Sequence, residues 1–217
     1  KYYCNVHVSQ QTKQVKMPDS IPEIKETIHK ESPYEIRYAY NYCTLSYTMP
    51  FWGYDEWQRE LDYFALNGVN LILDTTATEA LWVEYLQNYG YDIEAAKAFV
   101  CGYAYKAWWL MGNLESYGGP VSDEWIIDTV EMARVNQRKM TVLQPCLQGF
   151  MGAMPENFAN VANETLVEDY GFEDIHSYMV AQGDWSGFTR PPILKTTYDG
   201  YNALASKFYE VQEYIYG

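Results

Sequence analysis

The order of apolar and polar residues predicts strands that alternate with helices along most of the chain. Residues 37–44 (RYAYNYCT) have the composition of a strand, and residues 55–67 repeat apolar side chains at helical spacing up to Gly68, a helix stop. Residues 69–74 (VNLILD) are a continuous apolar run, as in a parallel strand that is buried on both faces. The first predicted unit is therefore strand, helix, strand.

The alternation continues through the rest of the chain. After the second strand the pattern predicts a helix to about Gly90, an aromatic helical segment through Met111, a helix at 122–139, a third strand at 141–147 and a helix at 198–215. Such alternation favours a parallel α/β fold, and both a barrel and a doubly wound sheet fit this order of elements.

Residues 1–33 do not follow this alternation. They combine a short alternating stretch with a polar, proline-containing stretch, which predicts the end of one unit and a linker, so the main domain is expected to start near Tyr34. The chain begins at Lys1, its ends fall in patterned sequence, and a closed (β/α) barrel usually needs about 250 residues. We therefore expect the 217 residues to be part of a longer protein.

Composition removes several classes of function. The formal charge is −14 without a cluster of Lys and Arg, so nucleic acid is not an expected partner, and no apolar run approaches the roughly 18 to 20 residues that cross a bilayer. The four cysteines form no CxxC pair, the three histidines lie far apart, and no GxGxxG, Walker, GxSxG or HExxH motif occurs. No metal site and no cofactor are predicted.

Aromatic residues make up 17% of the chain, with 22 Tyr and 7 Trp. Rings with a polar edge suit stacking on sugar faces, and they also suit a tyrosine-rich core. Composition leaves both interpretations open.

A long run, RYAYNYCTLSYTMPFWGYDEWQRELDYFALNGVNLILD at 37–74, resembles the start of the catalytic barrel of family 89 glycoside hydrolases, the α-N-acetylglucosaminidases. The likeness continues through Glu79 and Trp82, AWWLMGNL and GGP within 107–120, LQGF at 147–150 and QGDWSGFTRPP at 182–192. It implies an α/β fold, an incomplete (β/α)8 TIM-type barrel at 34–217, preceded at 1–33 by the end of a small α+β domain and a linker.

The resemblance also implies a function. Members remove terminal α-linked N-acetylglucosamine from glycans by a retaining mechanism with two glutamates, neither of which is in this chain, since the acid/base glutamate is expected beyond Gly217. The whole protein is expected to be secreted or at the cell surface in a bacterium, or lysosomal in a eukaryote. The alternative is a noncatalytic carbohydrate-binding or degenerate barrel relative.

By the same resemblance, the substrate-binding residues are Asn41, Cys43, Trp108 and Trp185. An amide offers a donor and an acceptor to sugar hydroxyls, and an indole face packs on the apolar face of a pyranose. From position alone these residues would be a strand-end turn, a small buried hydrophobe and core tryptophans.

Carboxylates in the chain are expected to support the site rather than to react. Asp74 and Glu79 are predicted to orient loops or cap the next helix, and Glu115 is predicted to be solvated. The chain departs from the family pattern at Ala77 and Thr78, where a Gly and a Gln are usual.

A parallel arrangement makes one further prediction. The strands at 37–44, 69–74 and 141–147 should be neighbours in an open sheet, with Asn41, Cys43, Asp74 and Gln148 near one rim.

Overall fold

The computed structural model of the chain describes residues 4, 6, 9, 17–41, 44, 52–74, 77–100, 143–147, 149–185, 188–189 and 191–216. The predicted helix at 122–139 and the aromatic segment from residue 101 to Met111 lie outside the described residues.

Three parallel strands form the central sheet, in the order β1 (Tyr38–Ala39), β2 (Leu71–Leu73) and β3 (Gln144–Cys146). Tyr38 pairs with Leu71, and Leu71 pairs in turn with Gln144. The predicted adjacency and parallel direction of the three strands are thus confirmed, although each strand is shorter than its sequence pattern. The described residues form no closed barrel, and Tyr38 on β1 is 49% exposed.

Pro145 occupies the middle of β3 without disturbing its pairing with β2. Alternate residues of a strand direct their backbone groups to opposite sides, and the Cys146 carbonyl accepts from Asp74 N at 3.0 Å. The backbone of Pro145 therefore faces away from β2, where its missing N–H removes no ladder hydrogen bond.

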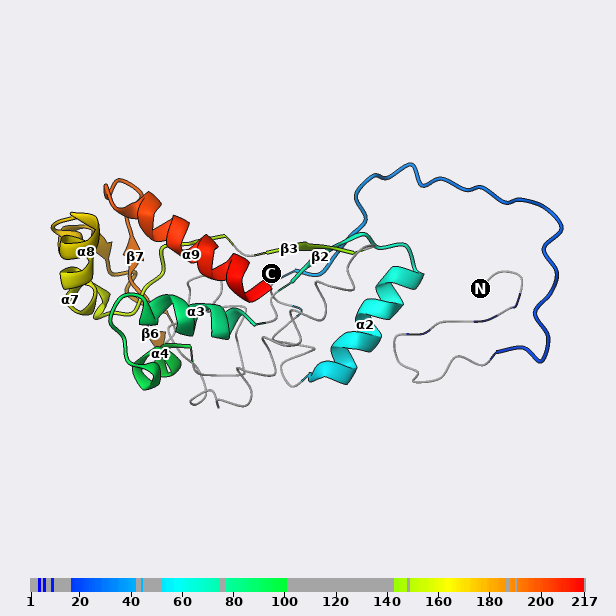
Figure 1. Ribbon diagram of the computed structural model, residues 1–217, viewed down its shortest axis with the longest axis horizontal. Helices are drawn as coiled ribbons and strands as arrows, with labels where there is room; N and C mark the ends of the chain where they lie inside the picture. Colours follow the sequence, from blue (N-terminus) through cyan, green and yellow to red (C-terminus); the bar gives the residue numbers. More distant parts are fainter. Residues whose placement is uncertain are drawn as a thin grey trace.

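Helix α2 (Tyr54–Leu66) lies between β1 and β2 in the chain, and Figure 1 shows it to one side of the drawn strands. Its start is capped by the Glu56 carboxylate, which accepts from Gly53 N at 3.1 Å, and the chain leaves it through Gly68 with φ 84°. Leu61 packs with Ile72 of β2 and Leu143 in a small apolar cluster beneath the helix. The predicted helix at 55–67 is confirmed to within one residue at each end.

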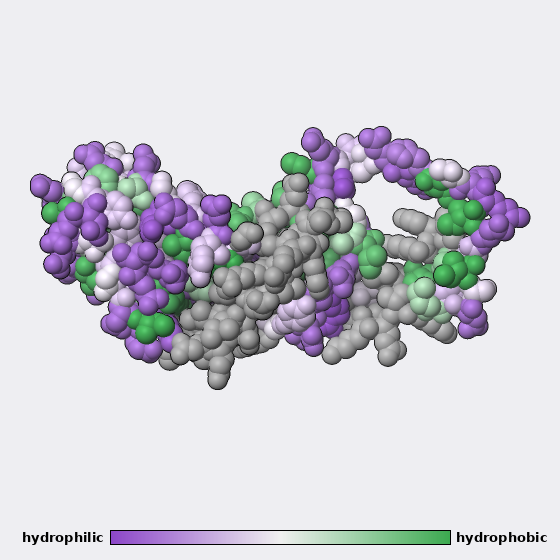
Figure 2. Space-filling view, viewed as in Figure 1, coloured by the Kyte–Doolittle hydropathy of each residue, from purple (hydrophilic) through white to green (hydrophobic). Residues whose placement is uncertain are grey.

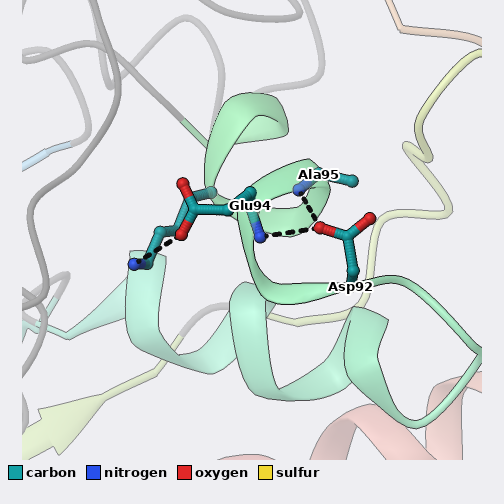
Figure 3. A network of polar contacts seen from close by, with 4 residues as sticks. Asp92, Glu94 and Ala95 are labelled. Atoms are coloured by element: carbon teal, nitrogen blue, oxygen red, sulfur yellow. Dashed lines mark hydrogen bonds and ion pairs between the residues drawn. The ribbon is translucent and has the colours of Figure 1, made fainter.

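A larger core lies among α3 (Thr78–Gln87), α4 (Ile93–Phe99) and α9 (Tyr201–Tyr216), since α3 packs against both other helices. Asp92 caps the start of helix α4, and its carboxylate accepts from the backbone N–H groups of Glu94 and Ala95, each at 3.0 Å (Figure 3). The predicted helices that end near Gly90 and span 198–215 correspond to α3 and α9.

Between β3 and α9 the chain adds short elements that the pattern did not predict. They are α7 (Phe158–Val161), α8 (Asn163–Tyr170), the 3₁₀ helix η1 (Ile175–Tyr178) and the antiparallel pairs β4 (Met179–Val180) with β7 (Ile193–Leu194) and β5 (Asp184–Trp185) with β6 (Phe188–Thr189). Helices α7 and α8 lie at the end of the molecule opposite the N-terminal segment (Figure 1).

Residues 17–36 contain no helix or strand, and nearly all are exposed. They run as an open loop away from the helices (Figure 1), and apolar residues appear along it in the space-filling view (Figure 2). Among them, Ile21 and Ile24 are exposed. The boundary between a preceding unit and the barrel stays a prediction.

Candidate functional site

The carboxyl ends of β1, β2 and β3 lie at one edge of the sheet because the strands are parallel. Asn41 follows β1 by two residues, and Asp74 follows β2 directly. In folds built from parallel β/α units, the loops at this edge bind ligands. This edge, called the carboxyl rim below, is the candidate site.

Tyr40 connects β1 to Asn41 in an uncommon conformation, with φ 77°. Its hydroxyl donates to Glu60 Oε1 at 2.8 Å, and its ring lies edge-on to Trp57 and Phe64 at centroid distances of 6.1 and 4.9 Å. Burial raises the pKa of Tyr40 well above its ordinary value of 10.0, and the hydrogen bond to Glu60 raises it further. Tyr40 is therefore a neutral donor to a side chain of α2.

Asn41 is exposed at the rim, and its amide orientation is defined by its contacts. Asn41 Oδ1 accepts from Thr44 N and from Thr44 Oγ1, each at 3.0 Å. Because a backbone N–H only donates, the oxygen must face Thr44, and Nδ2 takes the other branch of the amide. The two N–H donors of the amide are therefore on the side of the group that faces away from Thr44.

Behind the rim lies a buried polar group of four residues, Asp74, Thr78, Glu79 and Tyr216, defined here as the β2–α9 cluster. Asp74 and Glu79 are only 4% and 3% exposed. Burial and then the charge of Asp74 raise the pKa of Tyr216, while a side-chain hydrogen bond with Thr78 lowers it. The cluster joins the last residue of α9 to the start of α3.

Of the four predicted sugar-binding residues, the structure places the side chain of one, Asn41. Cys43 and Trp108 lie outside the described residues, as does Gln148 of the predicted rim and the carboxylate of Glu115. Trp185 is in β5, paired with Phe188 of β6, and its side chain is not described. The predicted proximity of Asn41 and Trp185 stays a prediction.

The described residues contain no group of three or more His, Cys, Asp or Glu side chains that could hold a metal ion. None of the described helices has the length and apolar content that a bilayer span requires.

The sequence did not predict two of the contacts described above. The Tyr40–Glu60 hydrogen bond joins residues 20 positions apart, and the bond between Thr78 and Tyr216 joins two helices. Neither contact has a signal in the local sequence pattern, because the partners are distant in the chain.

Parallel β/α units with polar side chains at the carboxyl rim define an α/β protein with a parallel sheet. Residues 37–217 match the family model described as the alpha-N-acetylglucosaminidase (NAGLU) tim-barrel domain. The chain belongs to this family, as its sequence motifs predicted.

Known relatives agree with this assignment. The chain is 31% identical over 171 residues to the human alpha-N-acetylglucosaminidase, a match that covers 78% of this chain and 23% of the human protein. It resembles the family 89 glycoside hydrolase of Clostridium perfringens in complex with PUGNAc with a TM-score of 0.84 and 36% identity, over 99% of this chain and 24% of that chain.

A second structure of the Clostridium perfringens enzyme carries two Glu-to-Gln substitutions and holds its substrate, GlcNAc-alpha-1,4-galactose. It matches with a TM-score of 0.83 at 36% identity, over 99% of this chain and 24% of that chain. The chain thus spans about a quarter of the length of these relatives, 23% of the human protein and 24% of the bacterial one.

Proposed function

We propose that this chain is part of an exo-acting α-N-acetylglucosaminidase that removes terminal α-linked N-acetylglucosamine from glycans. The observation that carries the proposal is the family match over residues 37–217, with a rim of parallel strands that presents Asn41. The Clostridium perfringens relative, 36% identical, is described with an α-linked N-acetylglucosaminyl disaccharide as its substrate. We extend that substrate class to the protein that contains this chain.

The reaction we propose is retaining hydrolysis by two carboxylates that lie outside these 217 residues. The two Glu-to-Gln substitutions in the substrate complex of the relative support a two-glutamate mechanism, because an amide can neither protonate the glycosidic oxygen nor attack the anomeric carbon. Within this chain, Asp74 and Glu79 are buried in the β2–α9 cluster, which favours a supporting role over a reacting one.

In this proposal the residues of this chain bind the sugar and do not react with it. Asn41 donates from Nδ2 to a hydroxyl or to the acetamide oxygen, since its oxygen is already engaged by Thr44. Trp108 and Trp185 pack on apolar faces of the pyranose or the acetamide methyl, and Cys43 lines the same pocket. No cofactor takes part.

Charge bears on the choice of glycan. With a formal charge of −14, the chain repels a sulfated polyanion at moderate salt, so we propose neutral, mucin-type glycans as the natural substrates. Such glycans lie outside the cytoplasm, which fits a secreted, cell-surface or lysosomal protein.

The first experiment compares the full-length protein with this chain alone on an aryl α-N-acetylglucosaminide. We expect the full-length protein to release N-acetylglucosamine with its α configuration at first, observed by NMR, and the chain alone to release none. Inversion by the full-length protein would contradict the mechanism, and hydrolysis by the chain alone would contradict the absence of the carboxylates.

The alternative, a noncatalytic carbohydrate-binding relative, makes a different prediction for the same protein. It would bind N-acetylglucosamine without turnover.

Whether the protein is a hydrolase or only binds the sugar, Trp185→Ala in the full-length protein is expected to weaken sugar binding by about 1 to 3 kcal/mol if the indole stacks on the ring. Calorimetry with N-acetylglucosamine measures this, and an unchanged affinity would assign Trp185 to packing.

A further inference from the structure

The connection between β1 and Asn41 contains a strained residue. Tyr40 has φ 77°, a conformation that glycine adopts freely and that brings the Cβ of any other residue close to its own backbone. Such backbone persists only where surrounding contacts enforce it, and it is often found beside functional residues.

The contacts that enforce it come from α2. The Tyr40 hydroxyl donates to Glu60 Oε1 at 2.8 Å, and Glu60 is itself buried, with 2% of its surface exposed. The ring is held edge-on to Phe64 and Trp57 on the same helix. A bond to a buried carboxylate is directional, so it defines the position of the ring more narrowly than apolar packing alone.

The strained backbone determines where the next residue lies. Ala39 is the last residue of β1 in register with β2, and Tyr40 turns the chain out of that register before Asn41. The side-chain oxygen of Asn41 then accepts two hydrogen bonds from Thr44. A change in the Tyr40 backbone would therefore move the Asn41 amide.

We propose that the hydrogen bond between Tyr40 and Glu60 positions Asn41 for sugar binding by holding the strained turn at the end of β1. Tyr40 and Glu60 are positioning residues, because they act on the ligand through Asn41. The inference rests on the proposed role of Asn41 in binding N-acetylglucosamine.

The test uses the full-length enzyme and Tyr40→Phe, which removes the hydroxyl and keeps the ring. We expect KM for the aryl α-N-acetylglucosaminide, and the inhibition constant of N-acetylglucosamine, to rise about three- to tenfold, the effect of one lost hydrogen bond. We expect kcat to stay within about twofold of the wild type, since a binding contact shared by ground state and transition state changes KM.

Three further variants separate positioning from general stability. Tyr85→Phe also removes a buried tyrosine hydroxyl bond, to the Leu204 carbonyl at 3.2 Å between α3 and α9, and should leave KM unchanged. Glu60→Gln keeps an oxygen that can accept from Tyr40 and should keep KM within about threefold of the wild type, whereas Glu60→Leu removes the acceptor and should reproduce Tyr40→Phe.

A double-mutant cycle gives the decisive result. If Tyr40 acts through Asn41, Tyr40→Phe adds no further rise in KM when Asn41 is already alanine. Full additivity of the two substitutions would overturn the inference, as would an unchanged KM in both Tyr40→Phe and Glu60→Leu while Asn41→Ala raises it. An unchanged KM in Asn41→Ala would instead reject the proposed role of Asn41 itself.

Discussion

At the scale of single residues, the backbone at Ala77 explains why the family pattern has a glycine at this position. It precedes α3 with φ 58° and ψ 13°, a left-handed conformation, and it is completely buried. The glycine that the family pattern has at this position adopts such a backbone at no steric cost. In this chain an alanine adopts the left-handed conformation, and its methyl group is buried in the larger core.

Ala77→Gly and Ala80→Gly form a matched pair that measures this strain. Both lose a buried methyl group, but only the first relieves a left-handed backbone, while the second places glycine inside a helix. We expect Ala77→Gly to change the free energy of unfolding by less than about 1 kcal/mol and Ala80→Gly to lower it by about 1.5 to 2 kcal/mol. Urea unfolding of the full-length protein measures both, and equal losses would show that Ala77 is unstrained.

At the scale of elements, the packing of α9 against α3 holds the larger core together. Phe208 of α9 is fully buried, and its ring lies 5.2 Å from that of Trp82 and 5.5 Å from that of Tyr85, both on α3. The end of the same helix is joined to α3 through Tyr216 and Thr78. Helix α9 thus connects the core to the carboxyl rim.

Truncation of Phe208 should therefore be far more damaging than truncation elsewhere on α9. We expect Phe208→Ala to lower the free energy of unfolding by about 3 to 5 kcal/mol, because the cavity lies among rings that cannot collapse together. Tyr214→Ala, at a position 69% exposed on the same helix, should change it by less than about 0.5 kcal/mol. Similar losses in the two variants, observed by urea unfolding, would contradict this account of the helix.

At the scale of the whole molecule, several of the 22 tyrosines belong to the core. Tyr85, Tyr89, Tyr91 and Tyr216 are all buried, and burial is the largest cause that raises the pKa of each. The composition that suggested sugar stacking is therefore explained in part by ordinary packing of aromatic rings.

Buried tyrosines predict a fold that weakens in alkali. Their folded pKa values lie above the ordinary value of 10.0, so the stability they contribute is fully present below about pH 10 and is lost as pH rises toward the folded pKa. Each such tyrosine is expected to add about 1.4 kcal/mol per pH unit to the fall in the free energy of unfolding.

Urea unfolding between pH 8 and pH 11 measures this slope in the full-length protein. Tyr85→Phe should reduce the slope above pH 10 by the contribution of one proton, about 1.4 kcal/mol per pH unit. The same slope in the variant and the wild type would mean that Tyr85 ionises without unfolding.

The apolar pattern of the sequence predicted most of the described longer helices and strands, and the sequence motifs predicted part of the site. The helix at 55–67 was recognisable because one buried face of a helix sets a period of apolar residues in the sequence. The run VNLILD was recognisable because a strand that is buried on both faces is continuously apolar. The antiparallel pair of β5 and β6 was missed because each strand has only two residues, too few to show a period.

Local pattern and motif were sufficient for the alternation of strands and helices, for the parallel order of β1, β2 and β3 and for membership of the family. Those properties follow from apolar periodicity and from contiguous motifs, which neighbouring residues encode. Only the folded chain could show that Tyr40 bonds to Glu60 and that Tyr216 bonds to Thr78. Such contacts depend on how helices pack across the sheet, where residues distant in sequence share one buried volume and must satisfy one another's polar groups.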